Sequence, residues 1–336
     1  MTGEMHEADV PSSLSGVAEK VSFFSRITKI RELTIALVVI ILMVILSFIS
    51  PTFLTSENLI TTILGIVMMG IVAVGMTIAL VSGGFDLSVG SVMSMSGVVA
   101  GSLVLSGMNI WIASVIGLVA SLLSGLITGF FIGKIKINPF IMTLGMQGVV
   151  QGIAYAVTQG APLSISNVPN SFLFIGQGNI MGIPALIWIL VVIVIIGDFL
   201  MRKAVVARKV YYIGSNENAA FFSGIRIARV KTWIYVLTAL LAGLAGILTL
   251  SRFSVADPTA GTGMELQAIA ACIIGGASLT GGEGSVLGAL LGSVLVGIVN
   301  DALVLLNVSV YWQSLVTGLV LIAAVTLDVL THRKRA

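Results

Sequence analysis

Long apolar runs separated by short polar segments occupy the chain from residue 33 onward. A run of about 17 to 25 apolar residues is long enough to cross the hydrocarbon core of a bilayer as an α-helix. The pattern predicts ten such segments, at residues 33–49, 59–81, 88–105, 110–132, 139–157, 184–201, 232–250, 266–279, 284–299 and 312–330. The predicted fold class is therefore an all-α, polytopic transmembrane helical protein.

The eighth and ninth segments are shorter than most and are joined by a glycine-rich stretch over residues 275–284. Backbone that interrupts helices can lie at membrane depth where it lines a protein cavity. The pair over 266–299 could accordingly form a re-entrant hairpin, and the count of membrane segments would then be eight. Both counts are even, so both place the two chain ends on the same side.

Composition supports a membrane protein, and the charges orient it. Hydrophobic residues make up 57% and charged residues 9% of the 336 residues, whereas soluble domains carry roughly 25% charged residues. Helix alternation places all but one of the 17 basic residues on one side, in the segments 1–32, 133–138, 202–231 and 331–336. Lys and Arg concentrate in cytoplasmic loops. We therefore predict cytoplasmic tails over 1–32 and 331–336 around a transmembrane domain over 33–330.

Residue patterns for metal, disulfide and nucleotide chemistry are scarce. Cys272 is the sole cysteine, and His6 and His332 lie at opposite ends of the chain, which leaves no pattern for a disulfide or a zinc site. The stretch 129–134 is not a phosphate-binding loop, because Ile135 stands where such a loop has Ser or Thr. We expect no catalytic residues, bound cofactor or metal on this chain. We also expect no nucleic-acid partner, because the basic clusters follow the membrane pattern.

Two glycine-containing stretches resemble each other. Residues 83–92 and 275–286 each follow an apolar run, open another, and share a Gly-Gly pair and a Gly-Ser-Val triplet. Paired glycine-interrupted segments are typical of transporters built from duplicated halves, where broken helices frame a central pathway. The alternative is that these small residues only allow close helix packing.

The segment 202–231 is longer than the other predicted loops. Within it, residues 212–225 predict a short helix, because Ser215 or Asn216 can cap its start and Gly224 suits a left-handed stop. Its aromatic residues, Phe221 and Phe222, would be presented to water, which is costly unless a partner covers them.

This helix resembles the coupling helix of ATP-binding-cassette importer permeases, specifically the ribose-type monosaccharide branch. The resemblance continues through residues 82–91, 138–146, 258–271 and 275–284, which occur in the family's order over most of the chain. Two positions depart from the family pattern, Phe85 in place of an aliphatic residue and Asn138 in place of a proline or small residue. These departures concern the substrate rather than family membership.

The resemblance implies a transport subunit with several partners. These are a second permease copy, identical or a paralogue, two cytoplasmic ATPase subunits that carry ATP and Mg, and an extracytoplasmic sugar-binding protein. It further implies a multi-pass protein of the bacterial inner membrane that imports a neutral monosaccharide. The residues expected to couple to the ATPase are Asn216, Glu217, Ala219, Ala220, Phe221, Phe222 and Gly224. Alternatively, this amphipathic helix lies on lipid headgroups.

Candidate pathway residues come from two segments and are Asp86, Ser88, Asn138, Pro139, Phe140, Thr143 and Gln147. Asp86 could cap the helix that begins near Ser88, or act as a gate, because carboxylates in membranes are costly and often functional. Thr143 and Gln147 share a helix face with Gln151. Their polar groups suit a passing sugar, and interhelical hydrogen bonding is the alternative.

Arg252 is the basic residue that departs from the one-sided charge pattern. With Asp257 and Glu265 it marks a segment predicted to face outward, where a binding protein would dock and where Arg could pair with a carboxylate of that partner. An internal ion pair with Asp257 is the alternative.

Other cargoes and another class of transporter remain open from the sequence. The same machinery could carry a nucleoside, a sugar-like signal molecule or a branched-chain amino acid. A stand-alone secondary transporter or channel would ordinarily place carboxylates or histidines within its spans, and this chain has almost none there.

Overall fold

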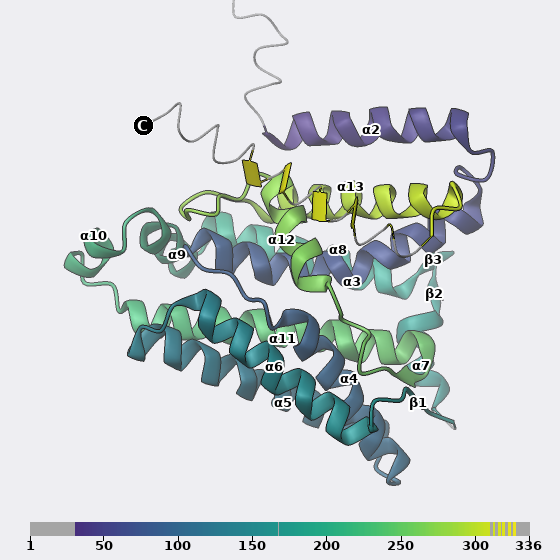
Figure 1. Cartoon of the computed structure of the whole chain (residues 1–336), viewed down its shortest axis with the longest axis horizontal. Coiled ribbons are helices and arrows are strands. Elements are labelled where there is room, and N and C mark those ends of the chain that lie inside the picture. Colours follow the sequence, from purple (N-terminus) through teal and green to yellow (C-terminus); the bar gives the residue numbers. More distant parts are fainter. Residues whose placement is uncertain are drawn as a thin grey trace, which may run out of the picture.

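The computed structural model describes residues 31–166 and 168–309, with scattered positions between 312 and 326. These residues are mainly helical (Figure 1) and confirm the all-α prediction. The helices are α2 (Arg31–Ile49), α3 (Ser56–Val81), α4 (Val89–Leu105), α5 (Ile110–Phe130), the π-helical turn η1 (Phe131–Ile135), α6 (Pro139–Thr158), α7 (Asn170–Gln177), α8 (Ala185–Lys203), α9 (Val205–Ser215), α10 (Glu217–Phe222), α11 (Ile227–Phe253), α12 (Met264–Ile274) and α13 (Val286–Leu305).

Short strands close two loops among the helices. The strand β1 (Leu163–Ser164) pairs antiparallel with β4 (Val255–Ala256), and β2 (Asn179–Ile180) pairs antiparallel with β3 (Ile183–Pro184). Both pairs lie at the end of the molecule that also holds α7, which we call the α7 end (Figure 1). The opposite end holds α9 and α10, and we call it the α10 end.

Seven helices in the described part of the chain are long and apolar enough to cross a membrane: α2, α3, α5 with η1, α6, α8, α11 and α13. The helix α4 coincides closely with the predicted segment 88–105. Residues 1–30 of the tail predicted over 1–32, the tail predicted over 331–336 and most of the predicted segment 312–330 lie outside the described residues. The last two residues of the first tail, Arg31 and Glu32, belong to α2.

The predicted segment 266–279 is wrong in extent. The helix α12 has 11 residues, which is ~16 Å at 1.5 Å per residue, about half of the ~30 Å hydrocarbon core. It ends at Ile274 because Gly275 and Gly276 follow, and Gly276 adopts a φ of 91°. The next helix, α13, has 20 residues and is long enough to cross alone.

The centre of the bundle is formed by α3, α4 and α11, with α5 packed against α4 and α11. Small residues allow these helices to approach closely. A Cβ on Gly246 of α11 would overlap the carbonyl oxygen of Met93 in α4, and a Cβ on Gly125 of α5 would overlap the carbonyl oxygen of Tyr235 in α11. Every residue of α3 from Ile66 to Val81 is buried.

Peripheral helices instead present apolar side chains outward. In Figure 1, α2 lies along one edge of the bundle while α5 and α6 lie along the opposite edge. Their exposed residues include Phe48 on α2, Val115 on α5 and Ile141 on α6. Such faces are normal for helices that meet lipid or another membrane subunit.

The basic clusters gather in space as the sequence pattern predicts. Lys134 and Lys136, which follow α5, line the same groove as Arg226 near α10. Arg202 and Lys203 are the last residues of α8, and only Ala204 separates them from α9. Arg252 lies at the far end of α11. The assignment of the α10 end to the cytoplasm remains a prediction.

Candidate functional site

The tip of the α10 end is built from two short helices. The sequence analysis expected one helix over 212–225, and the structure corrects this, because Tyr212 to Ser215 belong to α9, which begins at Val205. Asn216 separates α9 from α10 with an extended φ of −161°. Its Oδ1 accepts a hydrogen bond of 2.9 Å from the backbone N–H of Ala219 and so caps α10.

The end of α10 and its attachment to α11 are also defined. Gly224 adopts a φ of 79°, which confirms the predicted left-handed stop. The N–H of Ile225 donates to the carbonyl oxygen of Ala220 at 3.1 Å, and Ala220 is buried. An ion pair of 2.6 Å between Glu217 and Lys231 ties α10 to α11.

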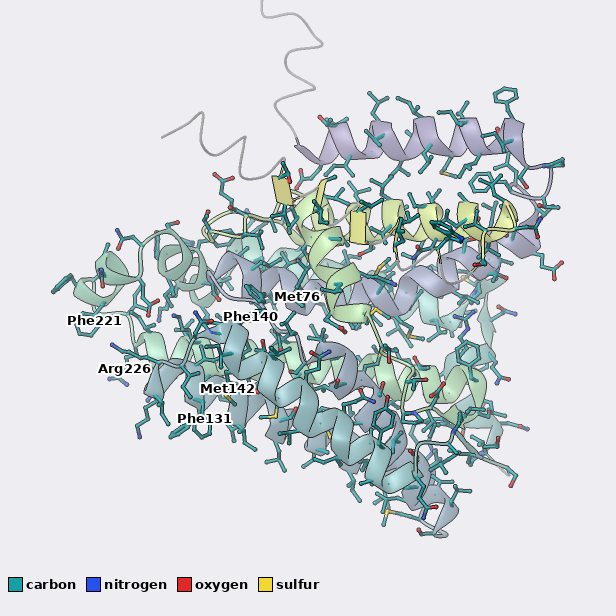
Figure 2. All side chains as sticks on the ribbon, in the orientation of Figure 1. Met76, Phe131, Phe140, Met142, Phe221 and Arg226 are labelled. Atoms are coloured by element: carbon teal, nitrogen blue, oxygen red, sulfur yellow. The ribbon has the colours of Figure 1, made fainter. Side chains whose placement is uncertain are left out.

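Phe221 of α10 lies at the outer tip of the α10 end (Figure 2), and Phe222 is the next residue of the same helix. Phe221 is 64% exposed and Phe222 is 86% exposed, and their rings meet edge to face with centroids 5.7 Å apart. Both line an open groove of about 930 Å³ with Lys134 and Arg226. Apolar rings beside cations suit either a protein partner with acidic residues at its rim or a lipid surface.

Asp86 stabilises the turn that leads into α4. Its Oδ1 accepts hydrogen bonds from the backbone N–H of Ser88 at 2.8 Å and from the Ser88 hydroxyl at 2.6 Å. Ser88 is the residue directly before the helix, so Asp86 supports the cap from two residues upstream rather than occupying it. Asp86 is 1% exposed, and a gating role remains a prediction.

Four of the pathway candidates lie at the start of α6. Asn138 Oδ1 accepts a 2.9 Å hydrogen bond from the N–H of Phe140, and Pro139 occupies the first turn, where its missing N–H costs nothing. The ring of Phe140 meets that of Phe85 at 6.2 Å. Thr143 is fully buried and its hydroxyl donates to the carbonyl oxygen of Pro139.

The glutamines of α6 form ties between segments. Gln147 Nε2 donates to Glu265 Oε1 of α12 at 3.3 Å. Gln151 Nε2 donates to the carbonyl oxygen of Pro258 at 2.7 Å. Gln147 therefore forms an interhelical hydrogen bond, which is the alternative that the sequence left open, while Gln151 binds the loop that precedes α12.

The three residues considered for docking an outside partner have different surroundings. Arg252 Nη1 donates to the carbonyl oxygen of Leu64 at 2.9 Å, and its guanidinium lies 4.8 Å from the centroid of the Phe253 ring. Asp257 Oδ1 accepts from the N–H and hydroxyl of Thr259, so the alternative Arg252–Asp257 ion pair does not form. Glu265 is 8% exposed, which leaves it little surface for a partner.

The two similar glycine stretches meet in space, and α9 joins them. The N–H of Gly282 donates to the carbonyl oxygen of Val81 at 2.9 Å. Cβ atoms added to Gly281 would touch the Gly83 backbone, and a Cβ on Gly214 of α9 would overlap the carbonyl oxygen of Val81. We call this contact of residues 81–83, 214 and 281–282 the glycine crossing. The sequence analysis identified the two stretches of the crossing from their shared glycine motif. It did not identify Gly214 as the third part of the crossing.

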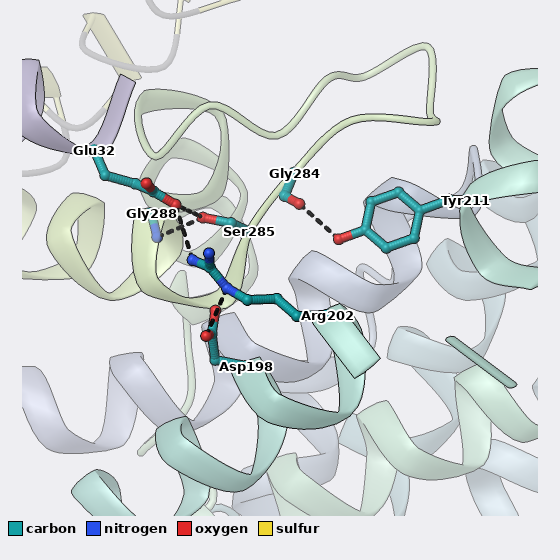
Figure 3. Close-up of polar contacts among 7 residues, drawn as sticks. All are labelled: Glu32, Asp198, Arg202, Tyr211, Gly284, Ser285 and Gly288. Atoms are coloured by element: carbon teal, nitrogen blue, oxygen red, sulfur yellow. Dashed lines mark hydrogen bonds and ion pairs between the residues drawn. The ribbon is translucent and has the colours of Figure 1, made fainter. Parts of the chain in front are cut away.

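A polar cluster beside this crossing was also missed. Figure 3 shows that it joins Glu32 of α2, Asp198 and Arg202 of α8, and Tyr211 of α9 to Gly284 and Ser285, at the start of α13. No local motif marks such a cluster, because its members lie far apart in the sequence. Among the described residues, no group of three His, Cys, Asp or Glu side chains is placed to hold a metal ion.

The chain is similar to known transport proteins. Residues 58–325 match the family described as branched-chain amino acid transport system / permease component. The ribose import permease protein of Escherichia coli (strain K12) is 38% identical over 256 residues, which cover 76% of this chain and 80% of that protein. That of Bacillus subtilis (strain 168) is 39% identical over 254 residues, covering 76% and 79%.

A second group of relatives is named for L-arabinose transport. The L-arabinose transport system permease protein of Escherichia coli (strain K12) is 38% identical over 254 residues, which cover 76% of this chain and 77% of that protein. No solved structure matches this chain significantly.

Proposed function

Because the chain belongs to the family of branched-chain amino acid transport system permease components, we propose that it is the membrane subunit of an ATP-driven sugar importer. The observation that carries the proposal is the exposed Phe221–Phe222 pair on a capped and tethered helix at the basic end of the bundle. Exposed aromatics beside cations are a typical anchor for a protein partner.

The proposed cargo is a neutral monosaccharide of the ribose type. Relatives named for ribose and for L-arabinose, at 38% identity each, support a pentose. The nearest alternatives keep the machinery and change the cargo to a nucleoside, a sugar-like signal molecule or a branched-chain amino acid. An external binding protein would deliver the cargo at the α7 end, with Arg252 and Asp257 as candidate contacts.

The proposed mechanism couples ATP binding to movement of the bundle. Two cytoplasmic ATPase subunits, which hold ATP and Mg, would each receive an α10 helix from one of two permease copies, identical or paralogous. Closure of the ATPases around ATP would move α10, and the bundles would rock between outward-open and inward-open states. The complex would reside in the bacterial inner membrane.

The test is co-purification with a sugar-importer ATPase after co-expression, followed by ATP hydrolysis in lipid. Phe222→Asp should abolish or strongly weaken capture, because a carboxylate replaces an aromatic anchor that is 86% exposed and therefore not needed for folding. Ser223→Asp is the matched control, since it adds the same charge to the neighbouring exposed position and leaves both rings in place.

Two outcomes would contradict the proposal. If the wild-type chain captures no such ATPase and moves solute alone in liposomes, the chain is a secondary transporter or channel. If Phe222→Asp retains the ATPase but the full-length variant in detergent loses binding of anionic lipid, α10 is a lipid-surface helix.

A further inference from the structure

The turn that opens α13 is held from two sides. Tyr211 of α9 donates its hydroxyl to the carbonyl oxygen of Gly284 at 2.8 Å. The next residue, Ser285, donates its hydroxyl to Glu32 Oε1 at 2.8 Å and accepts the N–H of Gly288 at 2.9 Å. The Ser285 side chain therefore caps α13 while it is tied to α2 (Figure 3).

Glu32 is in turn connected to the helix that precedes α9. Arg202 lies 3.3 Å from Glu32 Oε1 and 2.7 Å from Asp198 Oδ2, one turn earlier on α8. The Arg202 side chain is half exposed, so these pairs contribute little free energy by themselves. Their consequence is geometric, because they bring α2, the end of α8 and the start of α13 to one point.

The Tyr211 contact differs because it comes from α9. Tyr211 and Gly214 are three residues apart and share one face of α9. The α9 backbone at Gly214 packs so closely on Val81 and Gly282 that a side chain would not fit between them. The loop over 281–284 is thus contacted by α9 at two places, once by backbone packing and once by a directed hydrogen bond.

The loop over 281–284 can change its backbone conformation, whereas α9 is a packed helix that moves as a unit. Gly281, Gly282 and Gly284 adopt φ values of 87°, 79° and 153°, a region open to glycine at little cost, so the backbone there can change conformation. By contrast, α9 is an 11-residue helix with Ala207, Val210 and Ile213 buried along one face. A single residue, Asn216, separates α9 from α10, so displacement of α10 must reach α9 over a short path.

We propose that Tyr211 is a positioning residue that transmits movement of α10 to the glycine loop over 281–284, and through it to α12 and α13. This inference rests on the proposed function, since it requires a motor that moves α10. The hydroxyl remains a donor at neutral pH, because burial raises the pKa of Tyr211 and the carboxylate of Asp198 raises it further.

The test is Tyr211→Phe in the reconstituted complex of the full chain with its ATPase and binding protein. This substitution removes the hydroxyl and keeps the ring. We expect ATPase capture and the rate of ATP hydrolysis to stay at the wild-type level, while solute moved per ATP falls about fivefold, which corresponds to ~1 kcal/mol at 1.4 kcal/mol per tenfold. Loss of one hydrogen bond has this magnitude.

The matched control is Tyr212→Phe, which removes a hydroxyl from the next residue of α9, where the side chain is 58% exposed. It should leave the transport-to-hydrolysis ratio unchanged. A merely structural role for Tyr211 would lower yield, transport and hydrolysis together, and that result would overturn the proposal.

The outcomes separate this inference from the function on which it rests. Wild-type transport with an unchanged ratio in Tyr211→Phe overturns the inference and leaves the importer function standing. Failure of the wild-type chain to engage any ATPase overturns both.

Discussion

Gly214 is the point at which α9, the end of α3 and the glycine loop come together. A Cβ at this position would overlap the carbonyl oxygen of Val81 and crowd the backbone nitrogen of Gly282, which themselves form a hydrogen bond. Backbone atoms cannot move aside as a flexible side chain can. The glycine is therefore required by close approach, not by its own dihedral angles.

Gly214→Ala should therefore destabilise the subunit. Overpacking of a tight contact costs about 1 to 3 kcal/mol, and here it would also push α9 away from the loop. Thermal unfolding of the purified subunit in detergent measures the change. Gly145→Ala is the control, because Gly145 lies on α6 with nothing near its added Cβ. Equal melting temperatures for the two variants would contradict the close packing at Gly214.

At the scale of elements, residues near the helix ends predicted where those helices begin and stop. Contacts between residues far apart in the sequence were not predicted. The cap at Asn216 and the stop at Gly224 follow from residue chemistry near the helix ends. The first part of α9, residues 205–211, was assigned to a loop, although Ala207, Val210 and Ile213 recur every three residues and are buried. The whole segment 202–231 had been interpreted as one loop between two apolar runs, with a helix only over 212–225. Tyr211 could not be predicted as a contact, since its partner Gly284 lies 73 positions away.

The helix α10 depends on its cap, since it has six residues and isolated helices of that length are unstable in water. Asn216→Ala removes the side-chain acceptor for Ala219 and should cost ~1 kcal/mol of local helix stability. Affinity for the ATPase should fall about fivefold as a result. A binding titration measures it, with Asn216→Asp as the conservative variant that keeps the oxygen. If both variants bind equally weakly, the amide contacts the partner directly.

At the scale of the whole molecule, charge distinguishes two ends. The described basic residues other than Arg252 lie toward the α10 end or the loops beside it, and this separation was predictable because it follows from loop positions along the chain. The face of α2 that would meet lipid or a second copy was not predictable, since nearly every residue of this helix after Glu32 is apolar. On α6, by contrast, Gln147 and Gln151 mark the face that contacts the rest of the bundle.

The orientation of these ends can be measured by cysteine labelling. With the buried Cys272 replaced by alanine, Arg208→Cys at the α10 end should resist a membrane-impermeant maleimide in intact cells and react after lysis. Met181→Cys in the β2–β3 turn, where Met181 is 92% exposed, should react without lysis. The reverse labelling pattern would place the α10 end outside and remove access to a cytoplasmic motor.

The glycine crossing also bears on how such a protein can diversify. Its contacts join backbone atoms of residues 81–83, 214 and 281–282, so they do not depend on the side chains that surround them. Substitutions on neighbouring helix faces can then accumulate and alter which solute is accepted, while the shape of the crossing stays constant. Related proteins can in this way carry different solutes while the glycine crossing is kept. The glycines of the crossing are then the positions expected to vary least.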